Sequence, residues 1–380
     1  MKDKKVLIVL PSSTPGGAER TTYNLIKGLK STGPLLLTQK GLHDFYKPLN
    51  IKMYFFEDYG CVSAGLSLST VVSYIKAVRE VVRTEQPSVI FGMMHFASLY
   101  VVLARDLFFL KAPTVASLRG NASAYFQKNP RADYKERLMV HYFSRRADLI
   151  IVPSLGIKND LTSHFGAKDS KVKVIPNGID LEWVRGLSKD EIYMKKDCSW
   201  IVTSVRLDTV QKDFLTLLKA FRIVRNSRMV KLLIIGDGPH KEKILSWIKE
   251  MSLNEDVLLL GFQNNPFQYI SKSEVFVLSS FFEGFGNVIV EAMALGVPVI
   301  STDCPSGPEE IIEHGINGFL VPVGDYNRMA EYILNILNDN ELWNKISLAG
   351  LKRAEDFSAL KMAKNYEKLF LELIELTDSK

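Results

Sequence analysis

The chain has 380 residues and a mass of 42.9 kDa, which suits two domains of about 150 to 200 residues. With 47% hydrophobic and 24% charged residues, its composition excludes a disordered, collagen-like or disulfide-stapled protein. The charge is divided: residues 1–174 hold 25 Lys and Arg against 13 Asp and Glu, and residues 175–380 hold 23 against 29. A basic half can serve an anionic lipid surface or a phosphorylated substrate, or its cations can simply be solvated. Without zinc-finger, leucine-zipper or aromatic RNA-binding signatures, no nucleic acid partner is expected.

Three features favour a cytoplasmic protein. The N-terminus has only five consecutive apolar residues, Val6 to Leu10, fewer than a signal-peptide core needs. The longest apolar tract, 89–110, contains charged residues and falls short of the roughly 20 residues of a membrane span, so it predicts a buried strand followed by a core helix. The cysteines are odd in number and too far apart for a metal motif: Cys61, Cys198 and Cys304.

Short apolar runs alternate with helical patterns, which predicts an α/β protein with two doubly wound parallel sheets. A turn-rich stretch at 176–196 predicts a linker between two domains, at 1–185 and 186–357. A last helix, 358–380, is expected to cross back onto the first domain. Strands are predicted at 6–10, 35–37, 53–56, 89–91, 114–117, 149–152 and 172–175, then at 200–204, 232–235, 257–260, 275–278, 297–301 and 318–321.

The turn after the first strand carries Gly16 and Gly17 at the expected start of a helix, followed by Glu19. Free N–H groups and the helix dipole favour an anion at such a position, by roughly 0.3 to 1 kcal/mol from the dipole. A plain tight turn would use the same two glycines.

The turn after strand 200–204 carries two cations, Arg206 and Lys212, close to the start of the next helix. Together they can clamp a diphosphate. Two exposed loop cations that bind no ligand would give the same sequence pattern. The turn after strand 232–235 contains Gly236-Asp237-Gly238-Pro239, but Lys241 stands where a dinucleotide fingerprint needs its third glycine. The glycines there predict only a close approach of the backbone to a ligand or a helix.

The most informative turn follows strand 275–278 and runs from Ser279 to Pro298. Glu283 precedes the expected helix and Glu291 lies in its early turns, so both can border one strand-end crevice, where Gly284 and Gly286 admit a phosphate to backbone N–H groups. A carboxylate can accept two hydrogen bonds from the diol of a sugar or ribose. As alternatives, Glu283 can be a helix N-terminal charge and Glu291 a solvated residue.

As a set, these residues resemble the retaining glycosyltransferases of family 4, which have the two-domain GT-B fold. The resemblance covers nearly the whole chain, and its strongest element is E-x7-E from Glu283 to Glu291. It implies a hexosyltransferase of bacterial polysaccharide, lipopolysaccharide or glycolipid synthesis that uses a nucleotide-sugar donor. The domain at 1–185 would then bind the acceptor, and the domain at 186–357 would bind the donor. Supporting segments are Gly16-Gly17, 175–180, Arg206 with Lys212, 236–238 and 317–322.

The resemblance also implies roles for individual residues. Arg206 and Lys212 would hold the donor diphosphate, Glu283 the transferred sugar and Glu291 the donor ribose. Phe262 would lie beside the base. Other donor contacts would come from Gly17, Gly236, Gly284, Phe285, Gly286, Asn287 and Val288, and acceptor contacts from Gly16, Glu19, Arg119 and Asn121.

One stretch departs from the family pattern. Many members carry a histidine in the first domain near the reacting sugar, where this chain has Ser117-Leu118-Arg119-Gly120-Asn121. An arginine cannot act as a base, so Arg119 is expected to bind an acceptor phosphate or a donor oxygen. The loop 304–309 resembles members that use UDP-hexoses or UDP-N-acetylhexosamines, which favours UDP as the donor nucleotide.

No cofactor or metal is expected, because the chain lacks Asp-x-Asp and its fixed cations can stabilise the leaving phosphate. The segment from Lys128 to Arg146, which includes Arg131, mixes cations with apolar residues and predicts either a surface helix for anionic lipid or an ordinary amphipathic helix.

The expected partners are a nucleotide sugar, a glycan or lipid-linked acceptor and the inner face of the cytoplasmic membrane. A nucleotide-sugar epimerase and a noncatalytic sugar-nucleotide-binding subunit are the alternatives.

Overall fold

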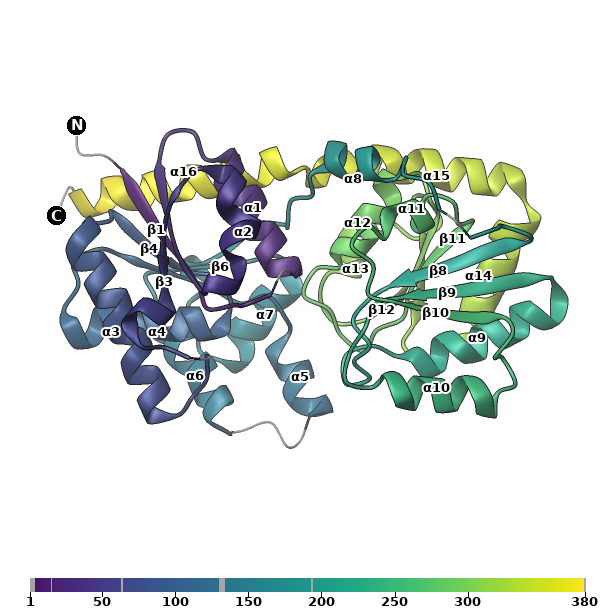
Figure 1. Ribbon diagram of the computed structural model, residues 1–380, viewed down its shortest axis with the longest axis horizontal. Helices are drawn as coiled ribbons and strands as arrows, with labels where there is room; N and C mark the ends of the chain where they lie inside the picture. The colour runs from purple at the N-terminus through teal and green to yellow at the C-terminus, as the bar shows by residue number, and fades with distance from the viewer. Residues whose placement is uncertain (1–3, 15, 63, 130–133, 193, 379–380) are drawn as a thin grey trace. The chain divides into compact units, whose positions relative to one another are not determined.

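The computed structural model describes residues 4–14, 16–62, 64–129, 134–192 and 194–378, and the structural statements below concern these residues. The chain forms two compact units (Figure 1). Unit 1 comprises 1–126, 130–178 and 359–380, and unit 2 comprises 127–129 and 179–358. The division between Gly178 and Ile179 falls a few residues before the predicted domain boundary.

Unit 1 contains a seven-stranded parallel sheet with strand order β3-β2-β1-β4-β5-β6-β7. The central strands are fully buried, which explains why they are continuous apolar runs rather than alternating ones. The strands are β1 (Lys5–Leu10), β2 (Gly33–Thr38), β3 (Lys52–Phe55), β4 (Val89–Gly92), β5 (Thr114–Ser117), β6 (Leu149–Val152) and β7 (Val172–Val174).

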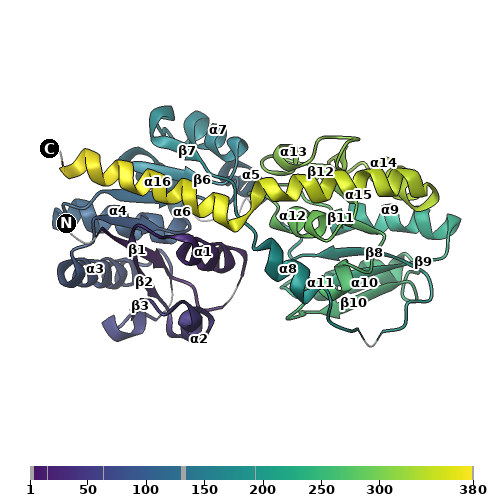
Figure 2. The same ribbon diagram turned by 90° about the horizontal axis from the view of Figure 1, so that it is seen from above.

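Helices cover both faces of this sheet. One face packs against α3 (Leu68–Glu85), α4 (His95–Phe108), α6 (Tyr134–Arg146) and α7 (Leu155–His164), and the other against α1 (Gly17–Gly28), α2 (His43–Tyr46) and α16 (Ala359–Asp378). Tyr366 and Phe370 of α16 are fully buried in the second of these cores, and α16 lies beside α1 (Figures 1 and 2). Helix α16 thus completes the core that contains β1, although unit 2 lies between them in the sequence. Shorter helices are η1 (Lys40–Leu42), η2 (Lys47–Leu49), η3 (Phe56–Tyr59), α5 (Ala122–Lys128) and η4 (Asp169–Lys171).

Unit 2 contains a six-stranded parallel sheet with strand order β10-β9-β8-β11-β12-β13. Its strands are β8 (Ser199–Ser204), β9 (Val230–Ile235), β10 (Val257–Gly261), β11 (Val275–Leu278), β12 (Val299–Asp303) and β13 (Phe319–Pro322). Its helices are α8 (Leu181–Leu187), α9 (Phe214–Ser227), α10 (Lys241–Glu250), α11 (Phe267–Ile270), α12 (Asn287–Ala294), α13 (Pro308–Ile311), α14 (Tyr326–Asn338), α15 (Asn340–Ala354) and η5 (Glu355–Phe357).

The structure confirms the predicted fold class and each predicted strand, with bounds that differ by at most two residues. The tract 89–110 is β4 followed by α4, as expected. The predicted linker differs, because it contains helix α8. The Asp180 carboxylate caps this helix by accepting a hydrogen bond from the Trp183 N–H at 3.1 Å, and Leu181 and Val184 bury its apolar face. Among the residues described, no helix is long and apolar enough to cross a membrane.

The strand order gives each sheet one switch point. In unit 1 it lies between β1 and β4, because β2 and β3 extend the sheet on one side of β1 and β4 to β7 extend it on the other. In unit 2 it lies between β8 and β11 for the same reason. Open parallel sheets bind ligands outside the carboxyl ends of the strands at such a point. The loops that follow β1 and β8 are therefore where the site residues are to be sought.

Candidate functional site

The loop after β8 carries the two predicted cations in different environments. Arg206 is exposed, and no described side chain pairs with it. Lys212 is buried, and its backbone N–H donates to the Asp208 carbonyl at 2.8 Å. The next residue, Asp213, caps α9 through a hydrogen bond from the Thr216 N–H at 3.1 Å. The loop thus fixes Lys212 and leaves the Arg206 guanidinium open to an anion.

Two loops at the switch point of unit 2 are joined by backbone hydrogen bonds. The Asp213 N–H donates to the Ser279 carbonyl at 3.0 Å, and the Phe281 N–H donates to the Gln211 carbonyl at 2.8 Å. Lys212 and Ser280 form an isolated antiparallel bridge between them. This pairing explains how residues some 70 positions apart come to share one site.

Glu283 lies at the centre of this loop pair. Its carboxylate forms a buried ion pair with Lys212, and it accepts hydrogen bonds from Ser280 Oγ at 2.6 Å and Gln211 Nε2 at 3.2 Å. Breaking one member of such a pair leaves an uncompensated buried charge. The structure thus brings Lys212 and Glu283 together directly, which their separate predicted roles did not anticipate.

The loop after β12 closes the other side of Glu283. The Glu283 N–H donates to the Pro305 carbonyl at 3.2 Å. Gly307 has φ +102°, and a Cβ atom there would lie 2.3 Å from the Phe285 carbonyl oxygen, so only glycine fits. Burial, and then the charge of Glu283, raises the pKa of the Cys304 thiol to about 12, which keeps that thiol protonated and unreactive.

The glycine loop after β11 leads into α12, as predicted. Gly286 has φ +98° and stands immediately before the first helical residue, Asn287. Phe285 is buried and makes an edge contact with Phe357, with ring centroids 5.4 Å apart. Gly284 is buried in the same loop, whereas Val288 and Glu291 are half-buried on the early turns of α12. Phe285 therefore anchors the loop, and only its backbone remains for ligand contact.

The Gly236 loop is explained by packing against its neighbour. Gly236 has φ +134°, and a Cβ atom there would lie 2.0 Å from the Val205 carbonyl oxygen. The Leu207 N–H donates to the Asp237 carbonyl at 3.0 Å. The expected close backbone approach is thus made to the loop that carries Arg206.

The Phe262 side chain, directly after β10, is 70% exposed. Its ring is therefore accessible to a planar group that stacks on it.

In unit 1 the predicted glycines stand where β1 leads into α1. The helix begins at Gly17, with Gly16 as its exposed N-cap residue, while Pro15 lies outside the described residues. Glu19 is buried in the first turn, and its carbonyl accepts a hydrogen bond from Tyr46 Oη at 2.9 Å. The N-terminus of α1 therefore opens at the carboxyl edge of this sheet.

Arg119 lies at the same edge, after β5, and is held by neutral groups. Its guanidinium donates to Asn177 Oδ1 and Tyr366 Oη, both at 2.7 Å, and lies 2.9 Å from Met93 Sδ. Its buried Nε has no hydrogen-bond partner. A half-buried guanidinium without a carboxylate is suited to an anionic ligand. Asn121 instead has a local role, because its Oδ1 accepts from the Ala124 N–H at 2.9 Å at the start of α5.

The structure therefore places each group of predicted residues at the carboxyl edge of its own sheet. Sequence reasoning missed Gln211 and Ser280, which hold Glu283, and the glycine at 307. The polar pair Ser279-Ser280, directly after a buried strand, was the sequence signal that could have located Ser280.

Within the described ranges, no group of three or more His, Cys, Asp or Glu side chains could hold a metal ion.

Comparison with known proteins agrees with this architecture. Residues 15–183 match the model of Glycosyltransferase Family 4, and residues 189–353 match that of Glycosyl transferases group 1. The N-acetylgalactosamine-N,N'-diacetylbacillosaminyl-diphospho-undecaprenol 4-alpha-N-acetylgalactosaminyltransferase of Campylobacter jejuni is 32% identical over 272 residues, 72% of this chain and 73% of that protein.

Two further proteins match over greater lengths. The lipopolysaccharide core biosynthesis glycosyltransferase LpsE of Rhizobium meliloti is 27% identical over 340 residues, 88% of this chain and 89% of its own. The structure of Anabaena HepE in complex with UDP and glucose has a TM-score of 0.79 at 21% identity, over 96% of this chain and 98% of that one. The chain therefore belongs to the family 4 glycosyltransferases and has their GT-B fold.

Proposed function

We propose that this glycosyltransferase moves a sugar from a UDP-sugar to a glycan or lipid-linked acceptor, with retention of the anomeric configuration. The observation that carries the proposal is the arrangement at the switch point of unit 2. There the exposed Arg206, the buried Lys212–Glu283 pair and the glycine loop before α12 stand on paired loops. Unit 2 would bind the donor and unit 1 the acceptor.

The proposed chemistry uses charge that is already in place. As the bond between sugar and phosphate breaks, negative charge grows on the leaving diphosphate, and fixed cations stabilise it without reorganisation. Arg206 and Lys212 would supply those cations, and the backbone N–H groups at the start of α12 would add to them. The leaving phosphate would take the acceptor proton on the same face. No carboxylate nucleophile and no metal are needed in this scheme.

Glu283 and Glu291 are assigned to hydroxyl groups of the donor. Glu283 already accepts hydrogen bonds from Ser280 and Gln211, so it is oriented before any sugar arrives. Glu291 would contact the ribose, and Phe262 would stack on the base. Arg119 would bind an acceptor phosphate or a donor oxygen, because its guanidinium is held by neutral partners.

The names of the relatives support the donor and acceptor classes. One transfers N-acetylgalactosaminyl to a diphospho-undecaprenol-linked acceptor, one acts in lipopolysaccharide core synthesis, and the Anabaena structure holds UDP and glucose. We therefore favour a UDP-hexose or UDP-N-acetylhexosamine donor, and a role in polysaccharide or glycolipid assembly. The protein would act in the cytoplasm, peripherally on the inner face of the membrane.

A donor panel tests the proposal. The purified chain is incubated with UDP- and GDP-sugars, and donor hydrolysis without acceptor is measured with and without EDTA. We expect hydrolysis of a UDP-hexose or UDP-N-acetylhexosamine that is insensitive to EDTA. Isomerisation of the donor would indicate an epimerase, and binding without turnover would indicate a noncatalytic subunit. Once an acceptor is found, NMR of the product must show the donor's anomeric configuration, since inversion would overturn the proposed mechanism.

A further inference from the structure

A groove lies along helices α4 and α6 on the outer face of unit 1. Its volume is about 560 Å³, within the ~300 to 1,000 Å³ usual for ligand pockets. Its lining is largely apolar and includes Leu66, Leu99, Leu103, Leu138 and Met139. Leu138 remains 58% exposed. The groove therefore offers an apolar chain a place that the protein's own core does not fill.

A polar cavity of about 470 Å³ adjoins the groove at the amino edge of the sheet. The two cavities share Arg145 and Arg146, which line both. The polar cavity is lined by five cationic side chains and only two acidic ones, so its net charge is positive: Arg105, Lys111, Arg145, Arg146 and Lys171 against Asp106 and Asp148.

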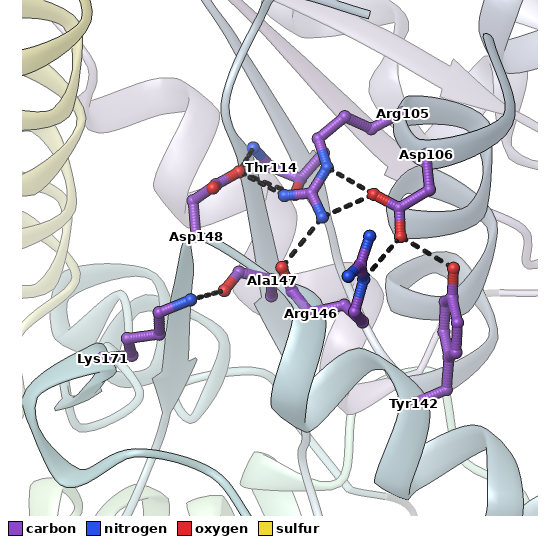
Figure 3. Close-up of polar contacts among 8 residues, drawn as sticks. All are labelled: Arg105, Asp106, Thr114, Tyr142, Arg146, Ala147, Asp148 and Lys171. Atoms are coloured by element: carbon purple, nitrogen blue, oxygen red, sulfur yellow. Dashed lines mark hydrogen bonds and ion pairs between the residues drawn. The ribbon is translucent and has the colours of Figure 1, made fainter. Parts of the chain in front are cut away.

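Figure 3 shows how the two carboxylates are used. Asp106 accepts from Arg105, from Arg146 Nε at 3.0 Å and from Tyr142 Oη at 2.8 Å. Burial acts to raise the pKa of Asp106, but these hydrogen bonds hold it below the ordinary value. Asp148 accepts from Arg105 Nη1 at 2.6 Å and from the Thr114 N–H at 2.8 Å. Both acids are therefore engaged by Arg105 and its neighbours.

Two of the remaining cations have no acidic partner. Lys111 and Arg145 are exposed, and no carboxylate among the described residues pairs with either of them. Lys171 donates to the Ala147 carbonyl at 2.9 Å, which leaves its charge uncompensated (Figure 3). The charge that remains available to a ligand at this end of the groove is positive.

Exposed apolar side chains stand next to the cations in the sequence. Leu107 is 58% exposed and Phe109 is 88% exposed, just before Lys111. Phe109, the residue directly after α4, has φ +53°, a left-handed conformation that glycine would adopt without strain. A bulky aromatic residue is thus kept at a helix end where its side chain gains no burial within unit 1.

We propose that this site, made of the α4–α6 groove and the cavity at Arg145 and Arg146, binds an anionic phospholipid of a bilayer. The lipid phosphate would lie among Lys111, Arg145 and Arg146, and an acyl chain would enter the groove past Leu138. Leu107 and Phe109 would enter the interface beside it, where aromatic and cationic side chains favour anionic lipid. The inference rests on the proposed action at a membrane, but it concerns a site at the opposite sheet edge from the sugar chemistry.

Vesicle sedimentation tests this site. The protein is spun with phosphatidylcholine vesicles with or without phosphatidylglycerol, at low and high salt. We expect binding only with phosphatidylglycerol, weakened by salt. The double variant Lys111→Glu/Arg145→Glu should lower partitioning about tenfold or more, since each basic residue near an anionic surface contributes to attraction. Leu138→Asn should weaken binding severalfold and leave its salt dependence intact.

A matched control changes the same charge on the opposite face of unit 1. Lys47→Glu/Lys364→Glu alters two exposed lysines near α2 and on α16 and should bind vesicles like the unaltered protein. Donor hydrolysis is measured for every variant and should not change. If the unaltered enzyme hydrolyses donor but ignores these vesicles, or if both double variants bind equally, the lipid site is wrong while the proposed transfer stands. If Leu138→Asn binds normally, no chain occupies the groove and the inference is likewise overturned.

Discussion

Arg206 and Lys212 differ at the level of single residues, although the sequence predicts one shared role for them. Lys212 is buried against Glu283, so it stabilises the fold in addition to the contact with the donor that we propose. Arg206 is exposed and has no partner among the described side chains, so the fold gains little from it. The two residues should therefore separate catalysis from stability.

Replacing Arg206 with alanine should slow transfer without destabilising the protein. Loss of one stabiliser of transition-state charge costs about 2 to 4 kcal/mol of barrier, roughly 30- to 1,000-fold in rate. The melting temperature should stay unchanged. Arg222→Ala, which removes an exposed cation of α9, is the control and should keep full activity. A fully active Arg206→Ala enzyme would contradict the role proposed for this residue.

Replacing Lys212 with alanine should lower both rate and stability. The change leaves the buried Glu283 carboxylate without its cation, at a cost of about 3 to 5 kcal/mol in the free energy of unfolding. The double variant Lys212→Met/Glu283→Gln removes both charges and should recover much of the stability but none of the activity. Urea unfolding and donor hydrolysis measure the two effects. Equal stability of the single and double variants would show that the pair does not hold this loop.

Glu85 gives unit 1 a pH-dependent contribution. Hydrogen bonds from Lys52 and then Tyr54 lower the pKa of Glu85 from 4.5 to about 2. Because the folded value lies below the unfolded one, the stabilisation is present above about pH 4.5 and is lost as the pH falls toward 2. Glu85→Gln should therefore destabilise the protein at neutral pH, and the difference from the unaltered chain should shrink through that window. Glu80→Gln, at an exposed pair with Arg83, should change little at either pH.

At the level of elements, the site of unit 2 depends on loops that touch backbone to backbone. The loops after β8, β11 and β12 are held at Asp213, Phe281 and Glu283 by main-chain hydrogen bonds. Glycines at 236 and 307 permit two of the closest approaches. A side chain added at either position would have to displace a neighbouring loop.

Gly307→Ala should impair donor binding by moving the loop beside Glu283. The new Cβ would lie 2.3 Å from the Phe285 carbonyl oxygen, at φ +102°, so the loop must shift. We expect a loss of about 1 to 3 kcal/mol in stability from backbone strain and a weaker affinity for UDP by calorimetry. Gly324→Ala, at φ +87° with open space around it, should show the strain alone and bind UDP normally. Similar UDP affinities for the two variants would argue against the loop contact.

The sequence predicted the elements well because the strands of both sheets are apolar runs separated by helical periodicity. It also located Arg206, Lys212 and Glu283 on strand-end loops. The pairing of Lys212 with Glu283 was not predictable, because it depends on two loops joined by a bridge at Ser280. Nor was the contact of Arg119 with Tyr366, which needs a helix from the far end of the chain. Helix α8 was missed because turn residues in 176–196 hid a short amphipathic segment.

For the whole molecule, unit 1 depends on a helix that follows all of unit 2 in the sequence. Phe370 of α16 is fully buried against the same core as Phe91, with ring centroids 5.6 Å apart. Truncating such a residue leaves a cavity and costs about 3 to 5 kcal/mol. The cost should fall on unit 1 alone.

Phe370→Ala should therefore loosen unit 1 and spare unit 2. Hydrogen exchange should show faster exchange of amides in β1 and β4, with those of β8 and β11 unchanged. Lys364→Ala, at an exposed position on the same helix, should exchange like the unaltered protein. Faster exchange in both sheets would mean that the two units unfold as one.

The return of α16 also sets an order for synthesis. A ribosome makes the strands of unit 1 long before Tyr366 and Phe370, which cover one side of that sheet. All of unit 2 up to Ser358 is translated before them. The second half of the polypeptide can thus acquire its core while one side of the first sheet, still without α16, exposes apolar surface, the condition under which folding intermediates aggregate.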